Sequence, residues 1–87
     1  MAPKVYVETT IISYLAGALL EAGAIPAGYA DDAMHVALAV VHGSDYLLTW
    51  NFRHLANAGV RERIAAACRA HGYQPVAICT PEELMED

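Results

Sequence analysis

Basic residues are scarce in this chain: five lysines and arginines stand against ten acidic residues, and the net charge is −5. Strong nonspecific binding to nucleic acid requires the neutralisation of many phosphates, so this composition excludes it. The arginines all fall within one stretch of the sequence, at Arg53, Arg61, Arg63 and Arg69. Such a local cluster either makes weak, transient contacts with a phosphate backbone or forms an ordinary solvated helix face.

Cysteines are also few, and Cys68 and Cys79 have no neighbouring cysteine or histidine at zinc-finger spacing. Two cysteines are too few for a disulfide framework, which predicts a reducing, cytoplasmic environment. A signal peptide is not expected, because Lys4 is the only early basic residue and Glu8 interrupts the apolar stretch that follows it.

Long apolar runs are missing as well. The nearly uncharged stretch at residues 33–44 is too short to cross a membrane and contains histidines. Nevertheless 56% of the residues are hydrophobic, above the roughly 45–50% of an ordinary globular domain. We expect one domain over residues 1–87, and in so small a domain this surplus predicts a homodimer or another oligomer interface.

Hydrophobic patterns and turn residues divide the chain into alternating strands and helices. Runs rich in β-branched and aromatic residues predict strands at residues 4–10, 45–50 and 75–79. Helices are expected at residues 11–20, from Asp31 or Asp32 as the N-cap to His42, at residues 60–71, and after Thr80. The second of these helices is apolar on nearly all sides, which predicts burial of most of its surface. Gly23, Gly43 and Gly72 are the expected helix ends. The helix at residues 60–71 is amphipathic, with one apolar stripe made of Val60, Ile64, Ala67 and Cys68. Residues 80–83 (TPEE) predict a capping box at the start of the last helix.

Apolar strands separated by helices predict an α/β fold with a short parallel sheet covered by helices on its faces. In such sheets, ligands bind beyond the carboxyl ends of the strands. Glu8 and Asn51 are expected at two such ends, and Asp31 and Asp32 at a helix N-terminus on the same rim. Mg²⁺ and Mn²⁺ prefer oxygen ligands of these kinds. The pattern therefore predicts a metal site for phosphodiester chemistry.

Thr9 and Thr49 are candidates for orienting metal-bound waters through hydrogen bonds. A purely structural role stays open for most of the candidate ligands. One aspartate is expected at a helix N-cap whatever the function, and asparagine often forms turns. Glu8 is harder to assign such a role, because a carboxylate after a buried strand is costly without a partner. His35 is expected to be a hydrogen-bonding neighbour of the aspartates rather than a ligand.

These segments together resemble the PIN domain, in the variant in which the first acidic residue is glutamate. The similarity lies in residues 4–15 (KVYVETTIISYL), 31–39 (DDAMHVALA), 46–52 (YLLTWNF), 72–75 (GYQP) and 79–84 (CTPEEL). The segments are individually short, but they occur in the same order and cover nearly the whole chain.

The resemblance implies a three-layer α/β/α fold and a VapC-like ribonuclease, the toxin of a type II toxin–antitoxin pair. Such enzymes cleave RNA with Mg²⁺ or Mn²⁺ held by acids, and they commonly form dimers. By position, Glu8 matches the first acid, Thr9 the hydroxyl residue after it, Asp32 the acid of the later helix with Asp31 beside it, and Asn51 the fourth ligand position.

One part of the family pattern is absent. PIN domains carry further helices and a strand between the first helix and the segment before the aspartate pair, and this part supplies a second acid. Here the chain passes from Leu15 almost directly to residues 18–23, and Glu21 lacks the flanking motif of that acid. The sequence thus predicts either a shortened metal-dependent endoribonuclease or a noncatalytic remnant that dimerises or binds an antitoxin. A small structural protein with a chance motif match is the third possibility.

Overall fold

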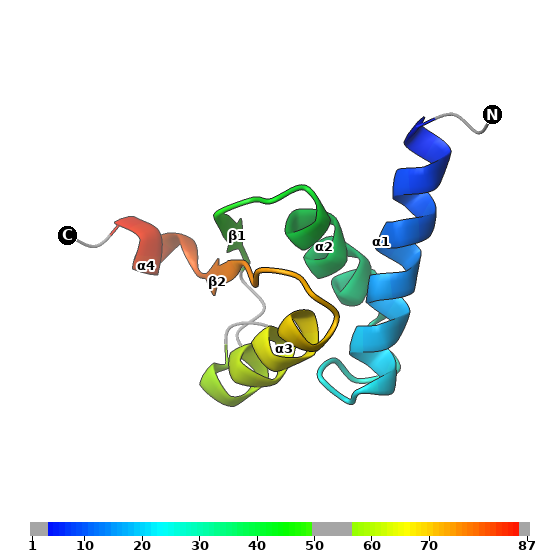
Figure 1. Cartoon of the computed structure of the whole chain (residues 1–87). Coiled ribbons are helices and arrows are strands. Elements are labelled where there is room, and N and C mark those ends of the chain that lie inside the picture. Colours follow the sequence, from blue (N-terminus) through cyan, green and yellow to red (C-terminus); the bar gives the residue numbers. More distant parts are fainter. Residues whose placement is uncertain (1–3, 50–56, 86–87) are drawn as a thin grey trace.

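The computed structural model describes residues 4–49 and 57–85, the side chains of residues 4–7 and of Leu84 excepted. The elements in chain order are α1 (Lys4–Glu21), α2 (Ala30–Val41), β1 (Tyr46–Leu48), α3 (Ala58–Ala70), β2 (Ala77–Cys79) and α4 (Pro81–Met85). Helices α1 and α2 pack side by side, and the sheet lies on the far side of α2 from α1 (Figure 1). None of the described helices has the length and apolar character that a membrane span requires.

The expected strand at residues 4–10 is wrong, because these residues form the first turns of α1. The helix expected at residues 11–20 is confirmed as the remainder of α1. Its buried residues Ile12, Leu15, Ala16 and Leu19 recur at helical spacing and fix this part in the core. No glycine or proline separates the two segments. The helix therefore extends backward, since each added residue gains a hydrogen bond and strand propensity depends strongly on context.

The start of α2 also differs from the expectation, because its N-cap is Tyr29 rather than an aspartate. The Tyr29 N–H donates to the carbonyl of Pro26, and this turn starts the helix at Ala30. Asp31 and Asp32 consequently lie in the first turn, where their charge still complements the positive end of the helix dipole.

The predicted glycine terminators are confirmed at the ends of α1, α2 and α3. After α2, the Ser44 N–H donates to the Ala39 carbonyl and the Gly43 N–H to the Val40 carbonyl, which is a Schellman motif. Gly43 has a φ of +69° there, a backbone conformation that residues with a Cβ rarely adopt. The same pattern of bonds follows α1 at Gly23 and α3 at Gly72.

The parallel sheet is confirmed, with two strands in the described part of the chain. Strands β1 and β2 pair in the register Tyr46–Ala77, Leu47–Ile78 and Leu48–Cys79, and α3 forms the crossover between them. The expected strands at residues 45–50 and 75–79 are thus confirmed in position but shorter. The α/β class holds, whereas a three-layer arrangement is not confirmed.

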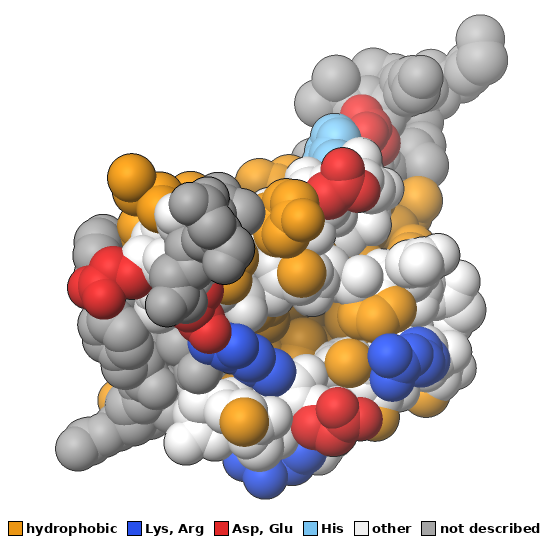
Figure 2. Space-filling model, turned by 90° about the vertical axis from the view of Figure 1, so that its left-hand side faces the viewer, with side chains coloured by type: hydrophobic (Ala, Val, Ile, Leu, Met, Phe, Trp, Pro, Cys, Tyr) orange, Lys and Arg blue, Asp and Glu red, His pale blue; other side chains and the backbone are white. Residues whose placement is uncertain are grey.

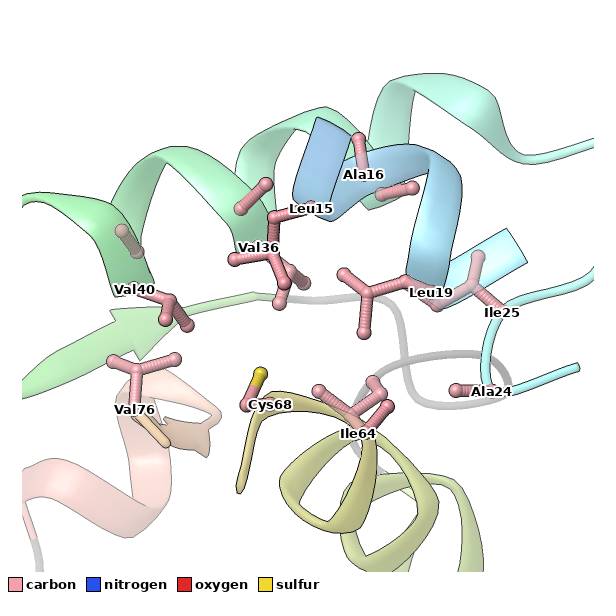
Figure 3. Packing of buried hydrophobic residues seen from close by; sticks show 14 of the residues in the cluster. Leu15, Ala16, Leu19, Ala24, Ile25, Val36, Val40, Ile64, Cys68 and Val76 are labelled. Atoms are coloured by element: carbon pink, nitrogen blue, oxygen red, sulfur yellow. The ribbon is translucent and has the colours of Figure 1, made fainter. Parts of the chain in front are cut away.

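The core lies between α1, α2, α3 and the residues around β2 (Figure 3). Its largest fully buried side chains are Leu15, Leu19, Ile25, Val36, Ile64 and Cys68. The stripe expected on α3 is confirmed, because Val60, Ile64, Ala67 and Cys68 are buried. The Asn57 side chain caps this helix by accepting hydrogen bonds from the Gly59 and Val60 N–H groups.

The predicted capping box at α4 is confirmed. The Thr80 hydroxyl accepts from the Glu83 N–H at 3.2 Å, and the Glu83 carboxylate accepts from the Thr80 N–H at 2.8 Å. The same carboxylate accepts from the Arg61 guanidinium of α3 at 2.9 Å. The bond from Arg61 and then the bond from Thr80 hold the pKa of Glu83 below its ordinary value. One carboxylate thus caps α4 and links it to α3.

Two leucines should separate core packing from surface effects. Leu19→Ala removes a fully buried side chain of the α1–α2 contact, and we expect it to lower the free energy of unfolding by about 2–5 kcal/mol. Leu38→Ala removes a half-exposed side chain and should cost below about 1 kcal/mol. Urea denaturation followed by circular dichroism measures both values. Equal losses would contradict the assignment of Leu19 to the core.

The Glu83 carboxylate should make stability depend on pH. Because its pKa is lowered in the folded state, its contribution is present above the ordinary glutamate value of 4.5 and is lost as the pH falls through the folded value. Glu83→Gln should therefore be less stable than the parent chain at pH 7, with the difference shrinking below about pH 4.5. Thermal unfolding from pH 7 to pH 3 tests this, with the exposed neighbour Glu82→Gln as the matched control. A difference that stays constant with pH would contradict the role of the charge.

Candidate functional site

The paired aspartates lie together at the first turn of α2. Asp31 is exposed and Asp32 is half-buried. Both line a shallow hollow of about 300 Å³, whose other walls are Gly28, Tyr29 and Ala30. Two adjacent carboxylates beside an open hollow and a helix N-terminus form a compact acidic site.

Glu8 lies elsewhere, on the partly exposed side of α1. Its Oε1 atom is 3.7 Å from Nε2 of His42, the residue that follows α2. Both side chains are partly exposed to solvent. An ion pair of this kind, which exists only when the histidine is protonated, contributes little to stability. Thr9, the neighbour of Glu8 on α1, is exposed.

The length of α2 separates Glu8 from Asp32. His42 follows Asp32 by ten positions, and a rise of about 1.5 Å per residue places the two backbones roughly 15 Å apart. Glu8 contacts the His42 end and Asp32 lies at the other end. The expected rim with Glu8 at a strand end beside Asp32 is therefore wrong in its placement of Glu8, because Glu8 is on a helix rather than at the end of a strand.

Thr49 lies at the end of β1. The Thr49 N–H donates to the Cys79 carbonyl at 2.9 Å, which continues the sheet by one bond after β1. Asn51 lies outside the described residues. The structure thus places Thr49 directly after β1, whereas the sequence predicts it inside a strand at residues 45–50.

The aspartate pair alone fits part of a metal site. Within residues 4–49 and 57–85, no group of three or more histidine, cysteine, aspartate and glutamate side chains is arranged to hold a metal. A protein commonly binds Mg²⁺ through one or two carboxylates, and waters and substrate oxygens complete the octahedron. Asp31 and Asp32 meet this minimum, whereas Glu8 is too distant to share an ion with them.

The sequence did not predict where a second, apolar surface would lie. The burial of α2 on most of its surface is only partly confirmed: Ala33, Val36, Ala37, Ala39 and Val40 are buried, but Met34 and Leu38 are 38% and 47% exposed. On β1, Tyr46 and Leu48 are 58% and 48% exposed. We call these four residues the α2–β1 surface. The signal was available in the hydrophobic surplus of the chain, but no pattern told which apolar residues remain uncovered.

A hollow of about 460 Å³ lies within the α2–β1 surface. Leu38 and Tyr46 form part of its wall, together with Leu47 and the two histidines His35 and His42. Figure 2 shows apolar side chains gathered in the middle of the face that carries the sheet, with charged side chains around them. His35 lines this apolar hollow. The expected hydrogen bond between His35 and the aspartates stays a prediction.

Cys68 is not an activated nucleophile. Cys68 is fully buried in the core, and this burial raises the pKa of its thiol, an effect that Arg69 only partly offsets. Since the thiolate is the reactive form, burial keeps Cys68 in a structural role. Cys79 is partly buried on β2.

Comparison of the chain with protein-family models, with curated proteins and with solved structures finds no match.

Proposed function

We propose that this chain is a shortened PIN-like protein of the VapC toxin type, and that it acts in the cytoplasm as a protein-binding module that pairs with a second copy of itself. The order of its motifs supports the first part of the proposal. The observation that carries the second part is the α2–β1 surface. An antitoxin is the other partner that the resemblance implies.

The exposed side chains of this surface come from two neighbouring elements, and two of them meet at one hollow. Met34 and Leu38 lie one turn apart on α2. On β1, Tyr46 and Leu48 lie on one face and Leu47 on the other. Leu38 and Tyr46 meet at the same hollow. Contiguous exposed apolar side chains mark interaction sites, and aromatic and methionine side chains are enriched in the buried centre of such sites.

The surroundings of this surface suit a dimer contact. The exposed residues His35 and His42 lie at its margin and can form a polar rim. The hollow has room for an apolar side chain of the partner, such as a tyrosine of a second copy. A two-fold axis through this region would bring identical patches together, which is the commonest arrangement of homodimers.

A single charge should disrupt this association. Leu38→Lys places an ammonium at the centre of the α2–β1 surface, and we expect it to raise the dimer dissociation constant at least about tenfold, or roughly 1.4 kcal/mol. Since Leu38 is half-exposed, the fold should persist. Sedimentation equilibrium over a range of concentrations measures the constant.

The matched control is Tyr14→Lys, which puts the same charge at an exposed apolar residue of α1 that contacts His71. The control should associate like the parent chain. A parent chain that stays monomeric throughout, or equal weakening in both variants, would contradict the proposed contact.

A second candidate function is metal-dependent cleavage of RNA, as in a VapC ribonuclease. The observation that favours it is the aspartate pair beside the hollow at the start of α2. Asp31 and Asp32 would hold Mg²⁺ or Mn²⁺, Asn51 would have the fourth ligand position that the resemblance implies, and Thr49 would orient a metal-bound water. Thr9 lies beside Glu8 on α1 and is therefore too far from the aspartates to take part. Such an ion supplies charge neutralisation on the phosphate and activation of a water molecule. The carboxylates bind and orient it, and Glu8 remains at the other end of α2.

Two variants test this candidate against the geometry. Mn²⁺ is titrated into the purified chain while cleavage of a labelled single-stranded RNA is followed. Asp32→Ala should abolish metal-dependent cleavage. Glu8→Ala should retain most of it, because Glu8 contacts His42, which lies about 15 Å from Asp32 along α2. Loss of cleavage in Glu8→Ala would contradict the placement of the site. No cleavage by the folded parent chain would contradict the ribonuclease and leave the binding module.

A further inference from the structure

The side chains of Glu8 and His42 are spaced differently from a hydrogen-bonded pair. Nε2 of His42 and Oε1 of Glu8 are 3.7 Å apart, whereas a hydrogen bond between a nitrogen and an oxygen spans about 2.7–3.2 Å. Two ligands of one tetrahedral zinc ion, each about 2.0–2.2 Å from the metal, lie roughly 3.4 Å from each other. The observed separation is therefore too long for a direct hydrogen bond and close to the separation of two zinc ligands.

The backbone of each of these residues is held by a helix. His42 directly follows α2, and its N–H donates to the Leu38 carbonyl at 3.1 Å. Glu8 lies in α1, one turn before the buried residue Ile12. The two side chains are 49% and 37% exposed, so an ion from solvent can reach both. Small side-chain rotations then suffice to bring both atoms to one ion.

The chemistry of this pair suits zinc rather than magnesium. A neutral imidazole nitrogen and a carboxylate oxygen are both common ligands of Zn²⁺, whereas Mg²⁺ prefers oxygen ligands alone. A closed structural zinc site has four protein ligands. In the described part of one chain, no group of three or more histidine, cysteine, aspartate and glutamate side chains is arranged to hold a metal. One copy therefore supplies half of such a site.

A second copy can supply the other half. His42 lines the same hollow as Leu38 and Tyr46, so the pair lies beside the α2–β1 surface. A two-fold axis that passes near His42 brings the same pair of the second copy to this place and gives two nitrogen and two oxygen ligands. It also brings two Glu8 carboxylates together, between chains that each carry a net charge of −5. A divalent cation between them offsets this repulsion.

We propose that Glu8 and His42 of two copies form one tetrahedral zinc site, which joins the copies at the margin of the α2–β1 surface. This inference rests on the association proposed above and names the cation that strengthens it. The site is separate from the aspartate pair at the other end of α2, whose oxygen ligands suit Mg²⁺ or Mn²⁺.

Sedimentation equilibrium of the full-length chain tests the zinc site. The dimer dissociation constant is measured in EDTA, with Zn²⁺ at one ion per two chains, and with Mg²⁺ in place of Zn²⁺. We expect Zn²⁺ to lower the constant at least about tenfold relative to EDTA, because only the dimer completes the ligand set. Mg²⁺ should leave the constant unchanged. His42→Gln and Glu8→Gln should lose the response to Zn²⁺. The control His71→Gln changes an exposed histidine that does not line the hollow, and it should keep the response.

Two results would overturn the proposal. A dissociation constant that is equal in EDTA and in Zn²⁺ would show that zinc does not join the copies, even where the parent chain dimerises. An equal response to Zn²⁺ in His42→Gln and in the parent chain would place the ion at other ligands. The values in EDTA test the apolar contact separately. A parent chain that is monomeric in EDTA and dimeric with Zn²⁺ supports the zinc site and contradicts association through the apolar surface alone.

Discussion

The packing of α1 against α2 is the contact on which the rest of the fold depends. Leu15 and Leu19 on α1 and Val36 on α2 are almost completely buried, and Ile64 and Cys68 of α3 close the core over them. The two short strands form few hydrogen bonds and cannot form a stable unit alone. They are positioned because the helices provide a surface for Leu47 and Ile78. Removing the helix pair would therefore leave the sheet without support.

Much of the fold could be predicted from local signals. The glycines after α1, α2 and α3, the stripe on α3 and the capping box at Thr80 all depend on residues close in sequence, and each of these predictions is confirmed. The first segment could not be predicted in this way. Its residue types favour a strand, but the anchored helix from Ile12 onward continues through it. In this segment, continuation of the helix outweighs the strand propensity of the residues.

The candidate site shows where prediction from sequence ends. Asp31 and Asp32 are neighbours in the chain, so their proximity needed no fold to establish it. The predicted proximity of Glu8 to the aspartates depended on a strand at residues 4–10. Helix α1 occupies these residues instead, and Glu8 and the aspartates lie at opposite ends of α2. The helix that carries the acids also presents Met34 and Leu38 to solvent. Helix α2 thus carries carboxylates in its first turn and exposed apolar side chains along its outer face.

The turn after α2 has a consequence for how the outer surface is encoded. Gly43 adopts a φ of +69°, and a Cβ built there would meet no atom within 4 Å. Space is thus available for a side chain, and only the backbone angle excludes one. That angle sets the direction in which the chain leaves α2 and enters β1, and hence the spacing of Leu38 and Tyr46. The shape of the α2–β1 surface therefore depends on one backbone torsion angle, at a glycine that contributes no side chain to that surface.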